Sequence, residues 1–248
     1  MVNTHFLHLL CSYAEVAKSD IVLEIGAGLG FLTRMLSQSS RKVFAVEVDH
    51  RLMKSLRAEL GNLDNIELIE GNVLTTNIRS PFNKLVSNPP FSISSRMLLW
   101  LLGKTFDRAV LTLQKEYAKR LIAPVGSKEY SRLTVCMYRK VEIELLDIVP
   151  REAFYPPPEV EAQIVRLRLL EKPPFKIRDE KIFDETVRLL FTQRNRKVQT
   201  AIRKIFPGHI LKSKRMGVKN PELLPFHNKR VRELAPEDFE VLANELSS

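Results

Sequence analysis

The residues with the clearest chemical potential are Asn88-Pro89-Pro90-Phe91, which follow an apolar run at Lys84–Ser87. Two prolines after an asparagine remove two backbone donors and stiffen the turn, so the side chain of Asn88 and the carbonyl of Pro89 can point together into a cleft. Two such oxygens suit an aryl amine such as adenine N6, because accepting both of its hydrogens favours a pyramidal nitrogen that can attack a methyl carbon. Phe91 would then supply a stacking face for an extruded base.

A glycine-rich turn lies upstream, where Gly26, Gly28 and Gly30 follow the apolar run that begins at Ile21. Glycines permit positive φ angles and let the backbone approach a ligand closely. The third glycine comes one position earlier than in the dinucleotide fingerprint, and Glu24 precedes the turn. S-adenosylmethionine has no pyrophosphate, and its sulfonium and ammonium groups favour a nearby carboxylate. The pattern therefore predicts S-adenosylmethionine as the cofactor rather than a dinucleotide.

Two further strand ends carry polar residues. Glu47 ends the run VFAVE, where an acid can bind both ribose hydroxyls. Asn72 follows the next run, and it would offer its amide oxygen to the adenine amine of the cofactor. The predicted catalytic residues are Asn88, Pro89, Pro90 and Phe91. The predicted cofactor-binding residues are Glu24, Gly26, Gly28, Gly30, Glu47, Val48, Asn72, Val73 and Asn88.

The elements that must position these residues follow a strand–helix rhythm. Between residues 21 and 113, short apolar runs alternate with amphipathic stretches, which predicts a parallel sheet covered by helices. Two longer runs, 141–150 and 162–170, are joined by a connection too short for a crossover helix, so we expect a closing antiparallel pair. The predicted fold class is therefore α/β, with a seven-stranded, mostly parallel sheet that has an antiparallel end.

The composition changes near residue 172, and the chain beyond it has helical patterns. We expect helices over 179–193, over 195–206 up to Pro207-Gly208, and after Pro236. A boundary at this point predicts a catalytic domain over residues 1–171 that binds S-adenosylmethionine. It also predicts a small C-terminal helical domain over residues 172–248 that binds RNA.

The charge balance indicates a polyanionic partner. The chain has 39 Lys and Arg residues against 29 Asp and Glu residues, a net charge of +10 and a pI near 9.7. The segment FTQRNRKVQTAIRKIF carries no acidic residue from Gln193 to Phe206, which argues against an ordinary solvated helix face. Its apolar stripe comprises Phe191, Val198, Ala201, Ile202 and Ile205. The predicted RNA-binding residues are Arg194, Arg196, Lys197, Arg203 and Lys204, and Lys115, Lys119 and Arg120 would extend the patch.

Other classes of protein are disfavoured. No stretch approaches the ~18 uncharged apolar residues of a spanning helix, and the N-terminus lacks the layout of a signal peptide, so we expect a cytoplasmic protein without membrane contact. Cys11 and Cys136 are too few and too far apart for a disulfide scaffold or a zinc site, and the five histidines show no ligand spacing. We therefore expect no metal.

In order along the chain, the segments EIGAGLGFLT, VEVD, GNVL, NPPF, LQKEYAKRL, AFYPPPEVEAQIVRL and FTQRNRKVQTAI resemble the archaeal branch of the KsgA/Dim1 family of ribosomal RNA adenine N6-dimethyltransferases. The resemblance runs from about residue 12 to about residue 206. It implies a Rossmann-like class I methyltransferase fold and N6-dimethylation of two adjacent adenines near the 3′ end of small-subunit (16S) rRNA. It also implies that the partner is this rRNA or a pre-30S particle late in ribosome biogenesis. We expect a monomer.

Two departures from the family keep other functions open. Asn72 stands where the family usually has Asp, and a neutral amide should bind adenine more weakly than a carboxylate. The family's N-terminal Q-x-F-L element has no clear match: His5-Phe6-Leu7 lies too close to Gly26 and on a helical pattern, which favours core packing. Either the chain begins inside that element or it holds its cofactor more loosely. The alternatives are a ribosome-assembly factor with weak or lost methylation and an N6-adenine methyltransferase acting on DNA or large-subunit rRNA.

Overall fold

The computed structural model describes residues 1–76, 78, 81–205 and 220–246, which form two compact units. The first unit comprises residues 1–119 and 141–169, and the second comprises residues 120–140 and the described chain from 170 onwards. The chain therefore passes between the units near the predicted boundary at 172. One continuous domain over residues 1–171 is nevertheless wrong, because residues 120–140 belong to the second unit.

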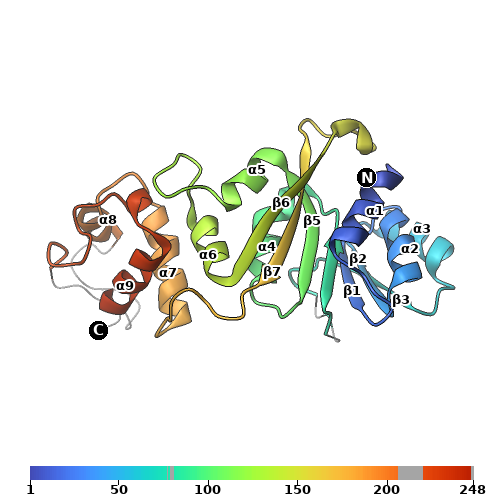
Figure 1. The fold of residues 1–248 in the computed structure, drawn as a ribbon, viewed down its shortest axis with the longest axis horizontal. Helices are drawn as coiled ribbons and strands as arrows, with labels where there is room; N and C mark the ends of the chain where they lie inside the picture. Colours follow the sequence, from blue (N-terminus) through green and yellow to red (C-terminus); the bar gives the residue numbers. More distant parts are fainter. Residues whose placement is uncertain (77, 79–80, 206–219, 247–248) are drawn as a thin grey trace. The chain divides into compact units, whose positions relative to one another are not determined.

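The first unit is built on a seven-stranded sheet with the order β3-β2-β1-β4-β5-β7-β6 (Figure 1). The strands are β1 Ile21–Ile25, β2 Lys42–Glu47, β3 Ile66–Glu70, β4 Lys84–Ser87, β5 Arg108–Gln114, β6 Val141–Val149 and β7 Ala162–Leu169. The first five are parallel, and β7 runs antiparallel to both β5 and β6. The predicted mostly parallel sheet with an antiparallel end is confirmed. The strand order reverses between β1 and β4, which creates a switch point of the kind that binds ligands in α/β folds.

Some of the helices pack on the sheet, and the others make up the second unit. They are α1 Thr4–Tyr13, α2 Phe31–Ser39, α3 His50–Leu60, α4 Ser94–Leu101, α5 Lys115–Leu121, α6 Arg132–Lys140, α7 Glu180–Phe191, α8 Val198–Ile205 and α9 Pro236–Leu246. Short 3-10 turns occur at η1 Phe91–Ile93, η2 Arg151–Ala153 and η3 Val231–Glu233. Almost every residue of β1, β2, β4 and β5 is buried, which explains why their sequences are continuous apolar runs without alternation.

One face of the sheet shares a core with α1, α2 and α3, which lie together beside the parallel strands in Figure 1. The apolar residues of these helices recur every three or four positions, as Met53, Leu56 and Leu60 do in α3, so each helix buries one stripe. α3 begins after Asp49, whose side chain accepts a hydrogen bond from the backbone of Arg51. This cap fixes the start of α3 just after the carboxyl end of β2.

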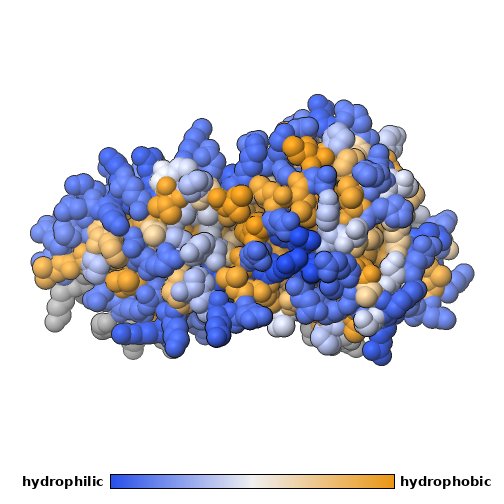
Figure 2. Space-filling view, in the orientation of Figure 1, coloured by the Kyte–Doolittle hydropathy of each residue, from blue (hydrophilic) through white to orange (hydrophobic). Residues whose placement is uncertain are grey.

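The second unit is helical. Asp179 caps α7, because its carboxylate accepts hydrogen bonds from the backbone N–H groups of Lys181 (2.8 Å) and Ile182 (3.1 Å). The predicted apolar stripe is confirmed at its centre, where Val198, Ala201 and Ile202 are buried, and its ends Phe191 and Ile205 are partly buried against the same core. Hydrophilic side chains cover much of the visible surface around α8 (Figure 2). The predicted helix end at Pro207-Gly208 lies outside the described residues.

Residues 120–140 belong to this unit because they contact residues far along the chain, which cannot be predicted from the local sequence. Tyr130 is 1% exposed, and its hydroxyl donates to the carbonyl of Leu234 at 2.9 Å. Arg139 of α6 forms an ion pair with Glu180 of α7. These partners lie far along the chain, which is why the sequence alone assigned the segment to the wrong domain.

Gly30 lies at the start of α2, where this helix packs against α3. Its φ is +80°, and a Cβ at this position would lie 2.8 Å from both Leu56 Cδ2 and Leu60 Cδ1. Gly28 also has a positive φ, +58°, but the nearest atom to its Cβ would be the carbonyl oxygen of Gly26 at 3.9 Å. A side chain at Gly30 would thus force the ends of two buried leucines of α3 to move, whereas one at Gly28 would make only an ordinary van der Waals contact.

We expect Gly30→Ala to lower the free energy of unfolding by about 3 kcal/mol, since it combines left-handed backbone strain with overpacking. Gly28→Ala, which introduces the strain alone, should cost about 1 kcal/mol. Urea unfolding of the two unliganded variants and the parent measures the difference. Equal losses in the two variants would contradict the packing role of Gly30.

Candidate active site

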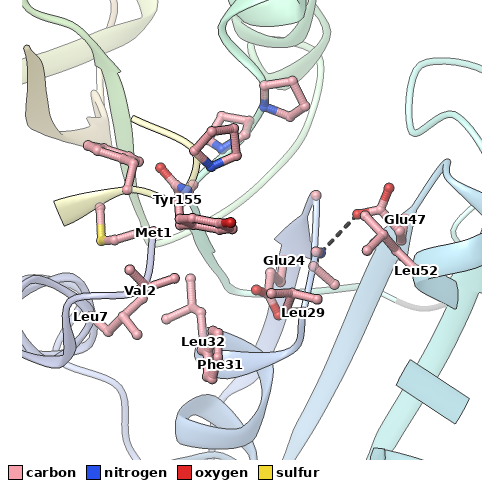
Figure 3. A pocket seen from close by; sticks show the side chains of 18 of the residues that line it. Met1, Val2, Leu7, Glu24, Leu29, Phe31, Leu32, Glu47, Leu52 and Tyr155 are labelled. Atoms are coloured by element: carbon pink, nitrogen blue, oxygen red, sulfur yellow. Dashed lines mark hydrogen bonds between the residues drawn. The ribbon is translucent and has the colours of Figure 1, made fainter. Parts of the chain in front are cut away.

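A pocket of about 690 Å³ opens at the carboxyl ends of β1, β2 and β4, wholly within the first unit. Its volume lies in the ~300–1,000 Å³ range of ligand sites. In Figure 3, Met1, Val2 and Leu7 line one side, Leu52 lies on the opposite side, and Glu24 lies between them. The complete lining is Met1, Val2, Leu7, Glu24, Gly26, Ala27, Gly28, Leu29, Phe31, Leu32, Glu47, Leu52, Asn88, Pro89, Pro90, Phe91, Phe154, Tyr155 and Pro156.

The glycine turn after β1 is held against two neighbouring strand ends. Gly26 donates its backbone N–H to the carbonyl of Val46 at 2.8 Å. Its φ of +78° and its position leave little room for a side chain, because a Cβ would lie 3.1 Å from Cδ of Pro90. Glycine at this position therefore lets the turn after β1 contact the turn after β4, the two predicted halves of the site.

The carboxylate of Glu47 fixes the same turn. Its Oε2 accepts the N–H of Gly28 at 2.9 Å, the dashed line in Figure 3, and its Oε1 accepts those of Val48 and Asp49 at 2.8 and 2.9 Å. A carboxylate has about four acceptor positions. Glu47 thus keeps capacity for a ligand hydroxyl while it shapes the pocket wall.

Glu24 is the most deeply buried acidic side chain of the pocket. It is 1% exposed, and its Oε2 has no hydrogen-bond partner among the described residues. Burial raises the pKa of the Glu24 carboxyl to about 8; the neighbouring Thr33 hydroxyl opposes this rise, and the nearby charge of Glu47 adds a smaller contribution to it. An unpaired buried carboxylate oxygen in a pocket wall fits a ligand that carries positive charge, as S-adenosylmethionine does.

The structure brings all four predicted catalytic residues to the pocket. The end of β4 is anchored by the hydroxyl of Ser87, which donates to the carbonyl of Ile25 at 2.6 Å. Asn88 follows at once, and its Oδ1 accepts a hydrogen bond from the hydroxyl of Thr112 in β5. Phe91 begins η1 and packs edge-on against Phe154, with ring centroids 6.4 Å apart. The turn is thus held by contacts with β1, with β5 and with the partly buried Phe154.

Four predicted cofactor residues do not reach the pocket wall in the described structure. Gly30 packs against α3, and Val48 is 66% exposed beside Glu47. Val73 is 2% exposed in the core, and the Oδ1 of Asn72 accepts the backbone N–H of Leu74 at 3.0 Å, closing a local turn. Their contacts with a cofactor stay predictions.

Comparisons with known proteins agree with this geometry. The family model described as "Ribosomal RNA adenine dimethylase" matches residues 1–238. A probable ribosomal RNA small subunit methyltransferase A from Methanosarcina acetivorans is 38% identical over 99% of this chain and 90% of its own length. Its counterpart from Methanopyrus kandleri is 41% identical over 82% of this chain and 73% of its own. The chain belongs to the ribosomal RNA adenine dimethylase family.

Two solved structures resemble this family member along nearly its whole length. A dimethyladenosine transferase from Plasmodium falciparum has a TM-score of 0.80 and 28% identity, covering 98% of this chain and 95% of its own. The 23S rRNA methyltransferase ErmE has a TM-score of 0.67 and 28% identity, covering 99% of this chain and 98% of its own. The fold is the Rossmann-like class I methyltransferase fold, and the chain is an S-adenosylmethionine-dependent rRNA adenine dimethyltransferase.

Several pocket residues of this dimethylase were missed from the sequence. Phe154-Tyr155-Pro156 come from the connection between β6 and β7, and Tyr155 is 79% exposed. The available signal was an aromatic and proline run in a connecting loop, where binding residues concentrate. Leu7 packs in the core as predicted, at 2% exposure, and also lines the pocket. The first residues reach the pocket because Val2 donates its N–H to the carbonyl of Ala153 at 2.8 Å.

The predicted RNA-binding residues of the second unit lie in two places: Arg194, Arg196 and Lys197 lie before α8, and Arg203 and Lys204 lie on it. Residues 194–197 precede α8 instead of lying on it, since the N–H groups of Val231 and Arg232 bond to the carbonyls of Arg196 and Arg194, both at 3.0 Å. The Nη2 of Arg194 donates to the carbonyls of Ser127 (3.1 Å) and Lys128 (2.8 Å), so this residue is structural.

Exposure and ion pairs decide which cations can meet RNA phosphates. Arg203 forms an ion pair with Glu222. In the first unit, Lys115 is paired with Glu161 at 2.7 Å and Lys119 with Glu116 at 2.9 Å, which weakens their predicted part in the patch. Three of the predicted RNA-binding residues are exposed without an acidic partner among the described residues: Arg196, Lys197 and Lys204.

Two kinds of feature are absent from the described residues of this dimethylase. No helix there is long and apolar enough to cross a membrane. Nor do three His, Cys, Asp or Glu side chains come together in that part of the chain in a way that could hold a metal ion.

The buried carboxyl predicts a pH dependence of stability. Because the pKa of Glu24 is about 8 in the folded chain and about 4.3 when unfolded, the unfolded state binds fewer protons between these values. The free energy of unfolding should therefore fall as pH rises through that interval and level off above about pH 8. Glu24→Gln cannot ionise and should lack this fall.

Urea unfolding of the parent and of Glu24→Gln from about pH 5 to about pH 9 measures the difference, which should reach a few kcal/mol in favour of the variant. Groups other than Glu24 titrate in both proteins, so only the difference between the two curves is diagnostic. Parallel curves would contradict the raised pKa.

Arg194 and Arg196 should respond in opposite ways to truncation. We expect Arg194→Ala to lower the free energy of unfolding by about 1–3 kcal/mol, since it leaves two carbonyls without their charged donor. Arg196→Ala should leave stability unchanged and weaken RNA binding, with the slope against salt reduced by about one. Unfolding and RNA-binding titrations at several salt concentrations test both variants. Loss of RNA binding at full stability in Arg194→Ala would contradict its structural role.

Proposed function

We propose that this chain dimethylates N6 of two adjacent adenines near the 3′ end of small-subunit (16S) rRNA, on a pre-30S particle during ribosome biogenesis. The observation that carries the proposal is the contact between the Gly26 turn and the Asn88–Phe91 turn in one pocket wall. The first turn suits a methyl donor and the second an aryl amine, and their contact lets donor and acceptor meet. We further propose that the chain acts as a cytoplasmic monomer without a metal.

The part of the pocket formed by Asn88–Phe91, called the acceptor half below, would prepare the amine of adenine for methyl transfer. Asn88 Oδ1 and the carbonyl of Pro89 would each accept one N–H hydrogen of adenine N6, which draws its lone pair out of conjugation with the ring. Phe91 would stack on the extruded base, and Phe154 supports its ring from the side. After one methylation a single N–H remains, and one acceptor is enough to orient it. The same two oxygens therefore serve both transfers.

The donor half would hold S-adenosylmethionine with residues that the pocket already presents. Glu24 would bind the positively charged end, the backbone of Gly26 and Gly28 would lie against the ligand, and Glu47 would accept a ribose hydrogen bond. When bound, the cofactor supplies a methyl group activated by its sulfonium. Ionised Glu24 would gain the counter-charge that it lacks in the described structure.

The proposed substrate follows from relatives and charge. The curated relatives, about 40% identical, are named as small-subunit methyltransferases. The net charge of +10 and the exposed Arg196, Lys197 and Lys204 support a polyanionic partner.

Specific observations favour other candidate functions. The 28% identity with ErmE, which is named as a 23S rRNA methyltransferase, favours large-subunit rRNA as a second substrate. Asn72 in place of an acid, with its Oδ1 already bonded to Leu74, favours an assembly factor with weak or lost methylation. The turn Asn88–Phe91 alone would also suit DNA adenine.

Transfer of a tritiated methyl group separates these functions. The chain is incubated with S-adenosylmethionine and with unmodified 30S particles, naked 16S rRNA, naked 23S rRNA or duplex DNA. We expect label on the 30S particles, in dimethyladenosine. Label confined to 23S rRNA or DNA would contradict the proposed substrate. Binding of 30S particles without any label would instead support the assembly factor.

Asn88→Ala tests the acceptor half. Because it removes one of two oxygens aimed at the amine, we expect the transfer rate to fall at least ~100-fold, the loss typical of a missing transition-state hydrogen bond. RNA binding should change little, and thermal stability should fall modestly, because the buried hydroxyl of Thr112 loses its acceptor. Asn62→Ala, the same change at an exposed residue outside the pocket, is the matched control. Unchanged turnover in Asn88→Ala would overturn the proposed role of the amide.

A further inference from the structure

A hydroxyl on the strand next to the acceptor turn lies directly beside Asn88. Ser87 of β4 lies opposite Leu111 of β5 in a parallel register, so the next pair along the two strands is Asn88 and Thr112. Neighbouring strands lie about 4.8 Å apart, which places the two side chains within hydrogen-bond reach. The structure has this bond, from Oγ1 of Thr112 to Oδ1 of Asn88.

Thr112 is well suited to hold a fixed orientation. It is fully buried, in a strand paired on both sides with β4 and β7, and its β-branched side chain has few rotamers. The hydroxyl of Thr112 donates to Oδ1 of Asn88, and it has no other acceptor among the described residues. Turning the amide of Asn88 over would present Nδ2 to the hydroxyl. Oγ1 could then accept from Nδ2, but the buried hydroxyl proton would be left without an acceptor, which favours the observed orientation.

We propose that Thr112 is a positioning residue that sets which end of the Asn88 amide faces the acceptor amine. An amide has an acceptor end and a donor end, and only the acceptor end can receive an N–H hydrogen of adenine N6. Oδ1 has two lone pairs, so it can accept from Thr112 and still accept a second hydrogen from a ligand in the pocket that Asn88 lines. Without the hydroxyl, both orientations of the amide become accessible and a fraction of the molecules present Nδ2 to the substrate. This inference rests on the proposed function.

The test compares Thr112→Val, which keeps the shape and removes the hydroxyl, with Thr112→Ser, which keeps the hydroxyl and removes a methyl group. Initial rates of methyl transfer to unmodified 30S particles give kcat and KM, and calorimetry gives the Kd for S-adenosylmethionine. We expect Thr112→Val to lower kcat about tenfold, with KM, Kd and Tm nearly unchanged. Thr112→Ser should stay within about twofold of the parent kcat.

The two variants distinguish orientation from packing. Equal kcat in Thr112→Val and the parent would overturn the inference, and so would an equal loss in Thr112→Ser, because that result would assign the effect to the lost shape. A loss confined to Tm or to the Kd of the cofactor would overturn it as well. The parent chain is measured in the same assay: if it transfers no methyl group, the proposed function fails, whereas an active parent with a fully active Thr112→Val refutes the positioning role alone.

Discussion

The site depends on a close approach between two backbone turns. Gly26 follows β1, Pro90 follows β4, and a Cβ on Gly26 would lie 3.1 Å from the Pro90 ring. β1 and β4 are adjacent parallel strands at the point where the strand order reverses, so their carboxyl ends open on the same edge of the sheet. A methyl donor on one turn and an amine on the other can meet only if the turns touch. Glycine and two prolines supply this contact, because one residue has no side chain and the others have rigid rings.

The donor half is built around a charge that the unliganded fold accommodates poorly. Burying Glu24 without a partner for Oε2 is unfavourable, and its raised pKa shows that the chain avoids ionising it. Replacing the carboxyl by an amide would relieve the fold and remove the attraction for a cation. A positively charged ligand would supply the counter-charge that the ionised form of this buried acid lacks. Glu47 differs, because three backbone N–H groups already stabilise its charge.

The sequence predicted those parts of the molecule that depend on strand ends. Glu24, Gly26 and Asn88 were identified because the end of a buried run fixes where the following residues lie, whatever the rest of the chain does. Tyr155 could not be found in this way, since its place depends on β7 pairing with β5. Arg194 was misread for a similar reason: its guanidinium bonds to backbone carbonyls at residues 127 and 128, and no local pattern reveals such partners. The placement of residues 120–140 in the second unit likewise depends on contacts with residues far along the chain.

The pocket itself cannot select one RNA. Any adenine carries the amine that Asn88 and Pro89 would grip, and any purine can stack on Phe91. Phosphate contacts from residues such as Arg196 and Lys204 would add affinity but carry little sequence information. We therefore expect selection to come from the shape of the RNA that presents the adenine, since proteins read RNA largely through single-stranded loops and ends. Proteins that resemble this chain along most of its length are named for small-subunit rRNA and for 23S rRNA. In the proposed function, the acceptor turn would determine the chemistry, and surfaces outside the pocket would determine the substrate.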